Sequence, residues 1–298
     1  MKILIAGLCA GMLLACDSGS KSEEQALVDA IDISNGDSEA VSAEVNDILH
    51  RIPSPLEISV LLKESGKSYN PAFLNSPDNA ERYNTNYRKA LNLGIYGTDL
   101  GYTNIYEHSQ DGIKYLSTIK GLADELNIGQ FFEMETIGRL AANSDNLDSL
   151  LLITTQNFNN INHYLQTQNR SGLSVLFLTG GWLEALHITC QVEKLNPGNT
   201  QLRETIGQQK IILESVMHLL SLYGENDKNM TALLGDMETL KKSFDQVTIT
   251  SVYKPSTYEV VNGVMMVKDN STCIIDITDA DIENIRTATE TIRTKITS

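Results

Sequence analysis

The fold of this chain is decided near its middle, by residues 171–195, SGLSVLFLTGGWLEALHITCQVEKL. Residues 175–183 are apolar on every side of a helix, and Glu184 and His187 interrupt the run before it reaches the roughly 18 residues that cross a bilayer. This pattern indicates a long helix at the centre of a folded protein, covered by other helices on several sides.

Two further long helices are predicted on either side of this one, over residues 145–168 and 199–223. In both, apolar residues recur with the 3.6-residue period of a helix, and polar breakers separate the three segments. The helix starts recur at a similar interval, but the segments share no residue signature of a tetratricopeptide-type repeat. The sequence therefore predicts an irregular antiparallel helical bundle or array, and not a solenoid.

Shorter helices are predicted before this trio. Ser54 as N-cap and Pro55 at the first helical position predict a short helix that ends near Gly66, and the same start signal recurs at Ser76-Pro77. Further helices are expected over residues 78–106, 113–126 and 131–142. Because antiparallel neighbours need only short loops, these helices extend the same bundle.

The predicted helix over residues 78–106 has a glycine-rich middle. Gly94, Gly97 and Gly101 each cost about 1 kcal/mol against alanine in a helix, so they indicate either the close approach of a neighbouring helix or a local bend. Trp182, which follows two glycines, is interpreted as a core anchor at a tight helix crossing, and a binding platform is the alternative.

Tyr96, Asp99 and Tyr102 are the candidate ligand-binding residues of this glycine-rich helix. Aromatic and acidic side chains beside a thin stretch of backbone can line a cleft. Helix packing alone also explains the glycines, so both interpretations stay open here.

The C-terminal part changes character after residue 247. β-branched residues dominate four short segments, 247–250, 258–261, 264–267 and 273–277. Asn262-Gly263 is a strong hairpin signal between two of them, so we expect a small antiparallel sheet. Thr278 then caps a final helix. Its apolar positions are Ile282, Ile285, Ile292 and Ile296.

The N-terminus has the layout of a secretory signal peptide. Lys2 precedes an apolar stretch over residues 3–15 that is too short to span a bilayer, and a polar run follows Cys16. Residues 13–16, LLAC, resemble the lipobox of bacterial lipoproteins. The resemblance implies cleavage before Cys16, a diacylglycerol on its thiol and a further acyl chain, such as palmitate, on its new amino group. The alternatives are an ordinary secretory signal with an incidental cysteine, and a buried N-terminal helix.

The rest of the chain resembles the uncharacterised all-helical envelope lipoproteins of Gram-negative bacteria, in general pattern and without a diagnostic motif. Asp17 resembles an inner-membrane retention signal, whereas Lys21 with its acidic neighbours resembles a surface-export signal, and a soluble spacer has the same composition. We therefore expect the protein in the cell envelope, lipid-anchored to the inner or the outer membrane and facing the periplasm or the surface.

These patterns divide the chain into four parts. They are a signal peptide over residues 1–15, an acidic flexible tether over 16–50, a helical domain over 51–247, and a small β-hairpin plus C-terminal helix over 248–298, packed on the helical domain. The predicted fold class is mainly α.

The chain is strongly acidic. Its formal net charge is −15, and removal of residues 1–15 takes away Lys2 and leaves −16. Such a charge repels the phosphates of nucleic acids and anionic lipids. The expected partners are therefore the membrane, through the N-terminal lipid, and a protein of the envelope, but no nucleic acid.

The sequence has no marker of a metal or cofactor site. No two histidines have the i, i+4 spacing that offers two zinc ligands on one helical face, and His187 with Cys190 has no further ligands. A glycine-lysine phosphate loop and a dinucleotide fingerprint are also missing from the sequence. Cys190 and Cys273 are expected to be two buried free thiols, although an oxidising compartment would permit them to pair.

The leading functional hypothesis is a non-enzymatic, lipid-tethered binding or assembly component. Two alternatives stay open. The first is an envelope hydrolase that uses paired carboxylates. Its candidate acids are Glu133, Glu135, Asp99, Glu107 and Glu184. The second is a small-molecule receptor with a site near Tyr96 and Tyr102.

Overall fold

The computed structural model describes residues 48, 55–133, 147–224, 227–261, 264–268 and 272–298. Outside this set lie the predicted signal peptide, Cys16, nearly all of the tether, Glu135 and most of the predicted helix over 131–142.

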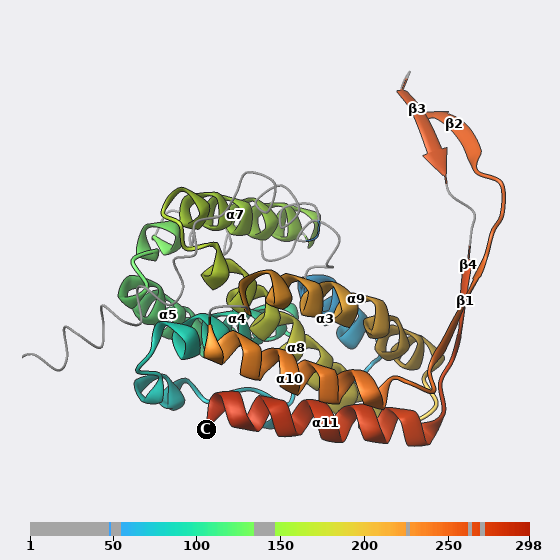
Figure 1. The fold of residues 1–298 in the computed structure, drawn as a ribbon. Coiled ribbons are helices and arrows are strands. Elements are labelled where there is room, and N and C mark those ends of the chain that lie inside the picture. Colours follow the sequence, from blue (N-terminus) through green and yellow to red (C-terminus); the bar gives the residue numbers. More distant parts are fainter. Residues whose placement is uncertain (1–47, 49–54, 134–146, 225–226, 262–263, 269–271) are drawn as a thin grey trace, which may run out of the picture.

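The described helices are α3 (Pro55–Glu64), η1 (Pro71–Phe73), η2 (Pro77–Arg82), α4 (Asn86–Ile105), α5 (Ser109–Glu125), η3 (Gly129–Phe132), α7 (Leu147–Thr167), α8 (Ser171–Leu195), α9 (Thr200–Gly224), α10 (Lys228–Ser243) and α11 (Asp279–Thr297), where η marks a short 3-10 helix. The strands are β1 (Thr248–Val252), β2 (Thr257–Val261), β3 (Val264–Lys268) and β4 (Thr272–Asp276). The fold is mainly helical with a small antiparallel β element before its last helix, as predicted (Figure 1).

Helix α8 lies at the centre of the helical body, as its apolar sequence predicted. It packs against α3, α4, α7, α9 and α11 (Figure 1). Among the described helices, α8 is the one that is long and apolar enough to cross a membrane, yet 89% of its most apolar window is buried inside the protein. This burial indicates that α8 serves as the core helix of the fold.

Glycines let α4 and α8 cross with their backbones almost in contact. A Cβ atom on Gly94 would lie 1.9 Å from the carbonyl oxygen of Phe177, and one on Gly180 would lie 2.0 Å from that of Leu91. Only glycine fits at these two positions. The predicted close approach of a neighbouring helix is therefore confirmed at Gly94. At Gly97 the nearest atom would lie 3.8 Å away, so packing does not require that glycine.

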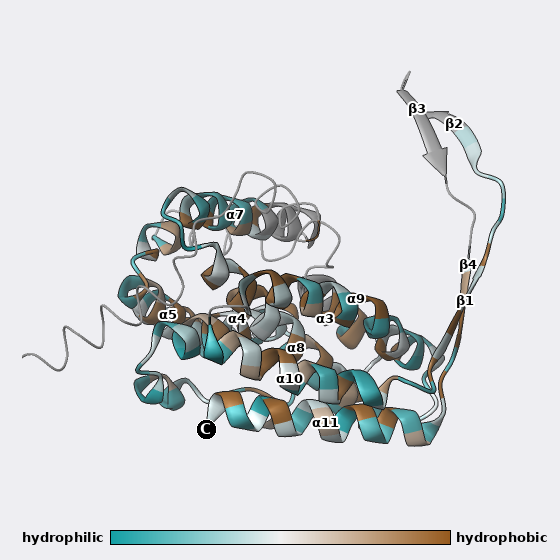
Figure 2. Cartoon of the chain, viewed as in Figure 1, coloured by the Kyte–Doolittle hydropathy of each residue, from teal (hydrophilic) through white to brown (hydrophobic). Residues whose placement is uncertain are grey.

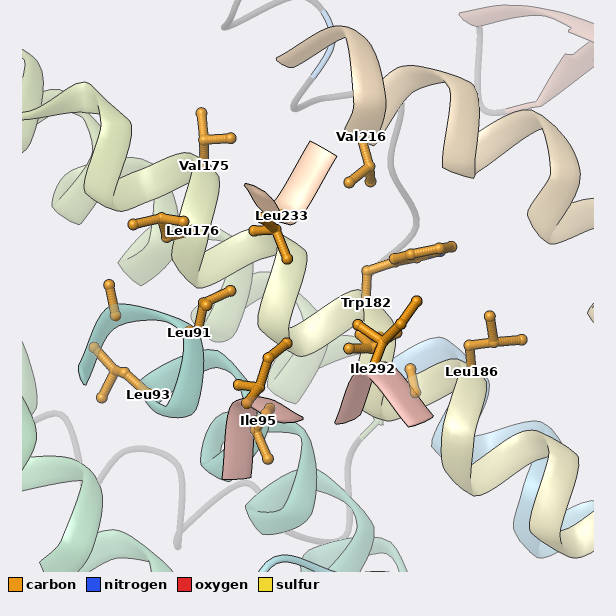
Figure 3. Packing of buried hydrophobic residues seen from close by; sticks show 14 of the residues in the cluster. Leu91, Leu93, Ile95, Val175, Leu176, Trp182, Leu186, Val216, Leu233 and Ile292 are labelled. Atoms are coloured by element: carbon orange, nitrogen blue, oxygen red, sulfur yellow. The ribbon is translucent and has the colours of Figure 1, made fainter. Parts of the chain in front are cut away.

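The hydrophobic core gathers around this crossing. Figure 3 shows buried side chains that converge from several helices. Those labelled are Leu91, Leu93, Ile95, Val175, Leu176, Trp182, Leu186, Val216, Leu233 and Ile292. The indole N–H of Trp182 donates to Oε1 of Gln209 at 2.9 Å, so this core anchor has its polar atom satisfied. In Figure 2, hydrophilic and hydrophobic residues mix along α10 and α11, as expected for amphipathic outer helices.

Helix α4 starts later than predicted. The sequence favoured one helix over residues 78–106, but the first part forms η2 and α4 begins only at Asn86. The cause is Thr85, whose extended backbone interrupts the helix and whose hydroxyl accepts the backbone N–H of Arg88 as an N-cap. The helix predicted from residue 131 is, in its described part, the 3-10 helix η3.

The four strands form a long two-stranded ribbon that extends away from the helices (Figure 1). β1 pairs antiparallel with β4, with Thr248 opposite Asp276, and β2 pairs with β3, with Val261 opposite Val264. The second pairing confirms the predicted hairpin. Four residues separate β1 from β2 but three separate β3 from β4, so the registers of the two pairings differ by one residue.

The last helix returns from this ribbon to the helical body. Thr278 and Asp281 form a capping box at its start, which extends the predicted Thr278 cap. The four predicted apolar positions of α11 are all buried, and the helix packs on α4, α8 and α10.

The two cysteines are free, as predicted, but only one of them is buried. Cys190 lies in the core of α8, whereas Cys273 is exposed on β4. The prediction of a buried Cys273 was wrong because Cys273 lies on β4 of the projecting ribbon, where its side chain faces solvent.

Candidate functional site

The three candidate ligand-binding residues lie together in the core of the protein. Tyr96, Asp99 and Tyr102 are buried on α4 and bind the segment over residues 70–76. The hydroxyl of Tyr96 donates to the carbonyl oxygen of Ser76 at 2.8 Å, and the hydroxyl of Tyr102 accepts the backbone N–H of Asn70 at 3.3 Å. In this conformation the polar groups of both tyrosines bind the protein's own backbone.

Asp99 belongs to a buried polar cluster that the sequence indicated only in part. Glu184 on α8 and Arg293 on α11 complete it, and we call these three residues the carboxyl cluster. Arg293 donates to both carboxylate oxygens of Glu184, from Nε at 2.5 Å and from Nη2 at 2.6 Å. Its Nη2 also donates to the carbonyl oxygen of Phe73 at 3.1 Å. The cluster therefore joins α4, α8, α11 and the segment over residues 70–76.

The carboxyl cluster holds two acids and one cation. Asp99 and Glu184 are both 0% exposed. Burial is the largest cause that raises the pKa of Asp99 well above its ordinary value, and the nearby Glu184 carboxylate is the second. Arg293 acts in the opposite direction but does not outweigh them. Burial acts to lower the pKa of Arg293, but Glu184 outweighs it and keeps the guanidinium protonated. The cluster therefore favours a neutral Asp99 beside an ionised pair of Glu184 and Arg293.

The hydrogen bonds of Asp99 are consistent with such a proton. Its Oδ2 accepts the backbone N–H of Asn75 at 3.1 Å, while its buried Oδ1 receives no hydrogen bond from any described group. Asp99 lies within hydrogen-bonding reach of Glu184. A proton on Oδ1 would donate to the Glu184 carboxylate and satisfy an atom that is otherwise buried and unpaired.

The polar network continues to the end of α11. Tyr83 accepts from the side chain of Asn75 at 3.0 Å, and its hydroxyl donates to the carbonyl oxygen of Thr297 at 3.3 Å. Asn92 donates to the carbonyl oxygen of Ile296 at 3.2 Å. These bonds satisfy carbonyl groups that a helix end leaves without partners. They also hold the end of α11 against α4.

His187 and Cys190 lie close to the cluster on α8 but have no features of a reactive pair. Burial lowers the pKa of His187 and outweighs the opposing effect of Glu184, and burial raises the pKa of the Cys190 thiol. Within the described parts of the chain, no group of three or more His, Cys, Asp or Glu side chains is placed to hold a metal ion.

The proposed hydrolase acids are mostly not brought together. Glu133 is exposed at the end of η3, and Glu107 is exposed and pairs with Lys63 at 3.1 Å. Glu135 lies outside the described residues. Only Asp99 and Glu184 meet, and both are closed off from solvent.

Arg293, Asn75 and Asn92 are the described members of the network that sequence reasoning missed. One signal pointed toward Arg293, because an acid such as Glu184, within the apolar middle of the central helix, requires a buried cation. The signal did not identify which of the many basic residues would supply it.

The β ribbon is a second candidate site, because it carries exposed large apolar side chains. Tyr253 is 79% exposed, Tyr258 69% and Ile274 61%. The base of the ribbon is held by α9, where a Cβ atom on Gly207 would lie 2.5 Å from Cγ2 of Ile275. Beyond that base the ribbon leaves the helices (Figure 1).

Comparisons with protein-family models, with curated proteins and with solved structures found no match. The site must therefore be interpreted from its own chemistry.

Proposed function

We propose that this protein is a lipid-anchored component of a bacterial cell envelope that binds a partner without enzymatic turnover, and that the β ribbon is its binding element. The observation that carries the proposal is the contrast between two sites. The carboxyl cluster is closed and bonded to the protein's own groups, whereas the ribbon presents Tyr253, Tyr258 and Ile274 to solvent.

An isolated two-stranded ribbon supports this proposal. Such a ribbon is only marginally stable in water, because it has no third layer to cover its apolar side chains. Large apolar groups that project together from a protein surface commonly mark an interaction site. A binding partner would cover these side chains and order the ribbon.

The anchoring half of the proposal comes from the N-terminal sequence. Each methylene of an acyl chain buried in a bilayer contributes roughly 0.8 kcal/mol, so two or three chains on Cys16 would hold the protein permanently. The formal net charge of −15 would not by itself attract the chain to anionic lipids. In cells, Cys16→Ser should move the protein from the membrane fraction to the soluble fraction, and mass spectrometry of the wild-type N-terminus should find acylated Cys16.

Photo-crosslinking tests the binding half. A photoreactive residue in place of Tyr258 should form adducts in intact cells, whereas the same residue in place of Ile113 on α5 should not. Ile113 is a matched control because it is also an exposed large apolar residue, at 65% exposure, but lies on the helical body. Equal labelling at both positions, or none at either, would contradict a ribbon-specific partner.

An envelope hydrolase is the alternative that one observation favours, namely the meeting of Asp99 and Glu184. We place it second because neither carboxyl group is accessible and Arg293 already neutralises Glu184. Turnover of an envelope substrate that Asp99→Asn abolishes, without loss of folding, would reverse this order. A receptor at Tyr96 and Tyr102 would likewise require their hydroxyls to leave the backbone groups that they now bind.

A further inference from the structure

We propose that residues 70–76 form a lid over the carboxyl cluster, and that this lid opens when Asp99 loses its proton. The inference goes beyond the proposed function, because it concerns neither the ribbon nor the lipid anchor and would hold if both were wrong. Its basis is the way in which the lid is bound and the charges that meet beneath it.

Two members of the carboxyl cluster bind the middle of the lid. Oδ2 of Asp99 accepts the backbone N–H of Asn75 at 3.1 Å. Nη2 of Arg293 donates to the carbonyl oxygen of Phe73 at 3.1 Å, while the same guanidinium binds Glu184. A change of charge within the cluster therefore acts directly on hydrogen bonds that hold the lid closed.

The lid is the weakest of the walls that enclose the cluster. On two sides, α4 and α8 cross at Gly94 and Gly180 with their backbones almost in contact, and on another side α11 is fixed by four buried isoleucines. Within the lid, Leu74 is the one buried apolar residue, Phe73 is half-buried, and the longest regular element is the three-residue η1. Segments with few buried apolar contacts open first, so the lid should move before the helices do.

Ionisation of Asp99 would create a conflict that opening relieves. While Asp99 is neutral, the Glu184 carboxylate has the Arg293 guanidinium as its counter-ion. An ionised Asp99 would place a second carboxylate in the same solvent-free site, where both acids are 0% exposed. Like charges in one buried site are unfavourable, and an open lid would admit water to solvate the second charge.

Asp99 is the group whose loss of a proton adds a negative charge to the cluster as pH rises. Burial raises the pKa of the nearby Tyr69, Tyr96 and Tyr115, so these phenols stay neutral. Burial lowers the pKa of His187, which favours its neutral form. The titratable and charged groups around the cluster are Tyr96 on α4, Glu184 and His187 on α8, Glu290 and Arg293 on α11, Tyr115 on α5, and Tyr69 and Tyr83 on either side of the lid.

An open lid would uncover the candidate ligand-binding residues. The backbone groups that bind the hydroxyls of Tyr96 and Tyr102 belong to Ser76 and Asn70, the two neighbouring ends of the lid with α4. One movement would therefore free both hydroxyls. The receptor alternative requires this movement, and the lid would make access of a small molecule to these tyrosines depend on pH.

Hydrogen exchange tests the lid in the mature Cys16→Ser protein. NMR from pH 5 to pH 9 measures the exchange of the backbone N–H of Asn75, and division of the intrinsic rate at each pH by the measured rate gives a protection factor. This factor should fall by up to tenfold per pH unit, because opening is coupled to the loss of one proton. At each pH it should lie far below the factor of a core amide such as that of Leu183 on α8, because the lid opens while the helices stay folded.

Two variants remove the conflict in different ways. Asp99→Asn cannot ionise, and Glu184→Gln leaves Arg293 as the counter-ion of an ionised Asp99. In either variant that keeps the helical circular dichroism signal, the protection factor of Asn75 should no longer depend on pH. The control is Asp111→Asn, which removes an acid that binds Tyr69 beside the lid and whose lowered pKa places its titration below this pH range. It should keep the parent's dependence on pH.

Three results would overturn the inference. The first is a protection factor of Asn75 in the parent that does not change with pH. The second is a fall with pH that persists in Asp99→Asn, because another group such as His187 would then cause it. The third is equal protection of Asn75 and Leu183, which would mean that the lid exchanges only when the whole protein unfolds.

Discussion

Arg293 and Glu184 form a bidentate ion pair inside the protein, although they lie 109 positions apart in the chain. The pair joins the last helix to the central helix, and no part of the Glu184 side chain reaches solvent. Each partner is therefore essential to the other, because a buried charge without its counter-ion is strongly unfavourable.

Loss of Arg293 should be severe. Arg293→Met leaves the Glu184 charge buried and should reduce the free energy of unfolding by about 3–5 kcal/mol in urea titrations. Adding Glu184→Leu to the same chain should recover most of that loss. The control is Lys295→Met on the same helix, which removes an exposed pair with Asp236 and should change stability by about 1 kcal/mol at most. Equal effects of the two single variants would argue against a special role for the buried pair.

Asp99 should make the protein less stable as pH rises. Its pKa is raised in the folded state by burial and by Glu184, so the folded protein retains a proton that the unfolded chain releases above about pH 4. Between that pH and the folded-state pKa, the free energy of unfolding should fall by about 1.4 kcal/mol per pH unit. Asp99→Asn removes the titrating proton and keeps a donor and an acceptor. The variant should have a higher Tm at pH 8, with the gain shrinking toward pH 4.

Asp111 is a control whose effect on stability should depend on pH in the opposite direction. Hydrogen bonds from Lys114 and Tyr69 lower its pKa, so its contribution to stability is present above the unfolded-state pKa and is lost as pH falls through the folded-state pKa. Asp111→Asn should therefore lower Tm slightly at neutral pH and have no effect in strong acid. If Asp99→Asn follows this same pattern, the protonated state assigned to Asp99 is wrong.

The two central glycines of α4 should respond differently to alanine. Gly94→Ala forces a methyl group onto the carbonyl oxygen of Phe177 and should destabilise the protein by about 3 kcal/mol or more. Gly97→Ala meets no such contact, so it should be neutral or stabilise the helix by up to about 1 kcal/mol. Thermal unfolding of both variants checks the crossing of α4 and α8. A lower Tm for Gly97→Ala than for Gly94→Ala would mean that the two helices do not cross at Gly94.

Thiol labelling should distinguish the two cysteines of the mature Cys16→Ser protein. Cys273 is exposed and should react with a maleimide in the folded state, while Cys190 is buried with a raised pKa and should react only after unfolding. One label per folded chain, lost in Cys273→Ser but kept in Cys190→Ser, is the expected result. Protection of Cys273 in the purified monomer would mean that the ribbon is covered by the body.

The long helices could be predicted because their own sequences specify them. α7, α8 and α9 lie within a few residues of the predicted segments, since apolar periodicity and polar breakers are local signals. The start of α4 was missed because the Thr85 cap outweighed a continuing apolar pattern. α10 was not singled out, although Met230, Leu233 and Met237 have helical spacing and are buried.

Only part of the candidate site could be predicted from the sequence. Tyr96, Asp99 and Tyr102 lie on one helix, so their proximity follows from helical spacing. Arg293 reaches Asp99 and Glu184 only because the chain passes through the ribbon and returns along α8. The alignment of α11 along α8 depends on tertiary packing, so the local sequence of α11 does not predict which residues of α8 it meets.

The position of α11 after the ribbon has a consequence for how a newly made chain folds. Until α11 has emerged and docked, the preceding helices lack one wall of their core, and Glu184 lacks the guanidinium that neutralises it. A product truncated within the ribbon would therefore expose apolar core side chains beside an acid without its counter-ion, and proteases should degrade it. Quality control of newly made molecules would then depend on the final helix.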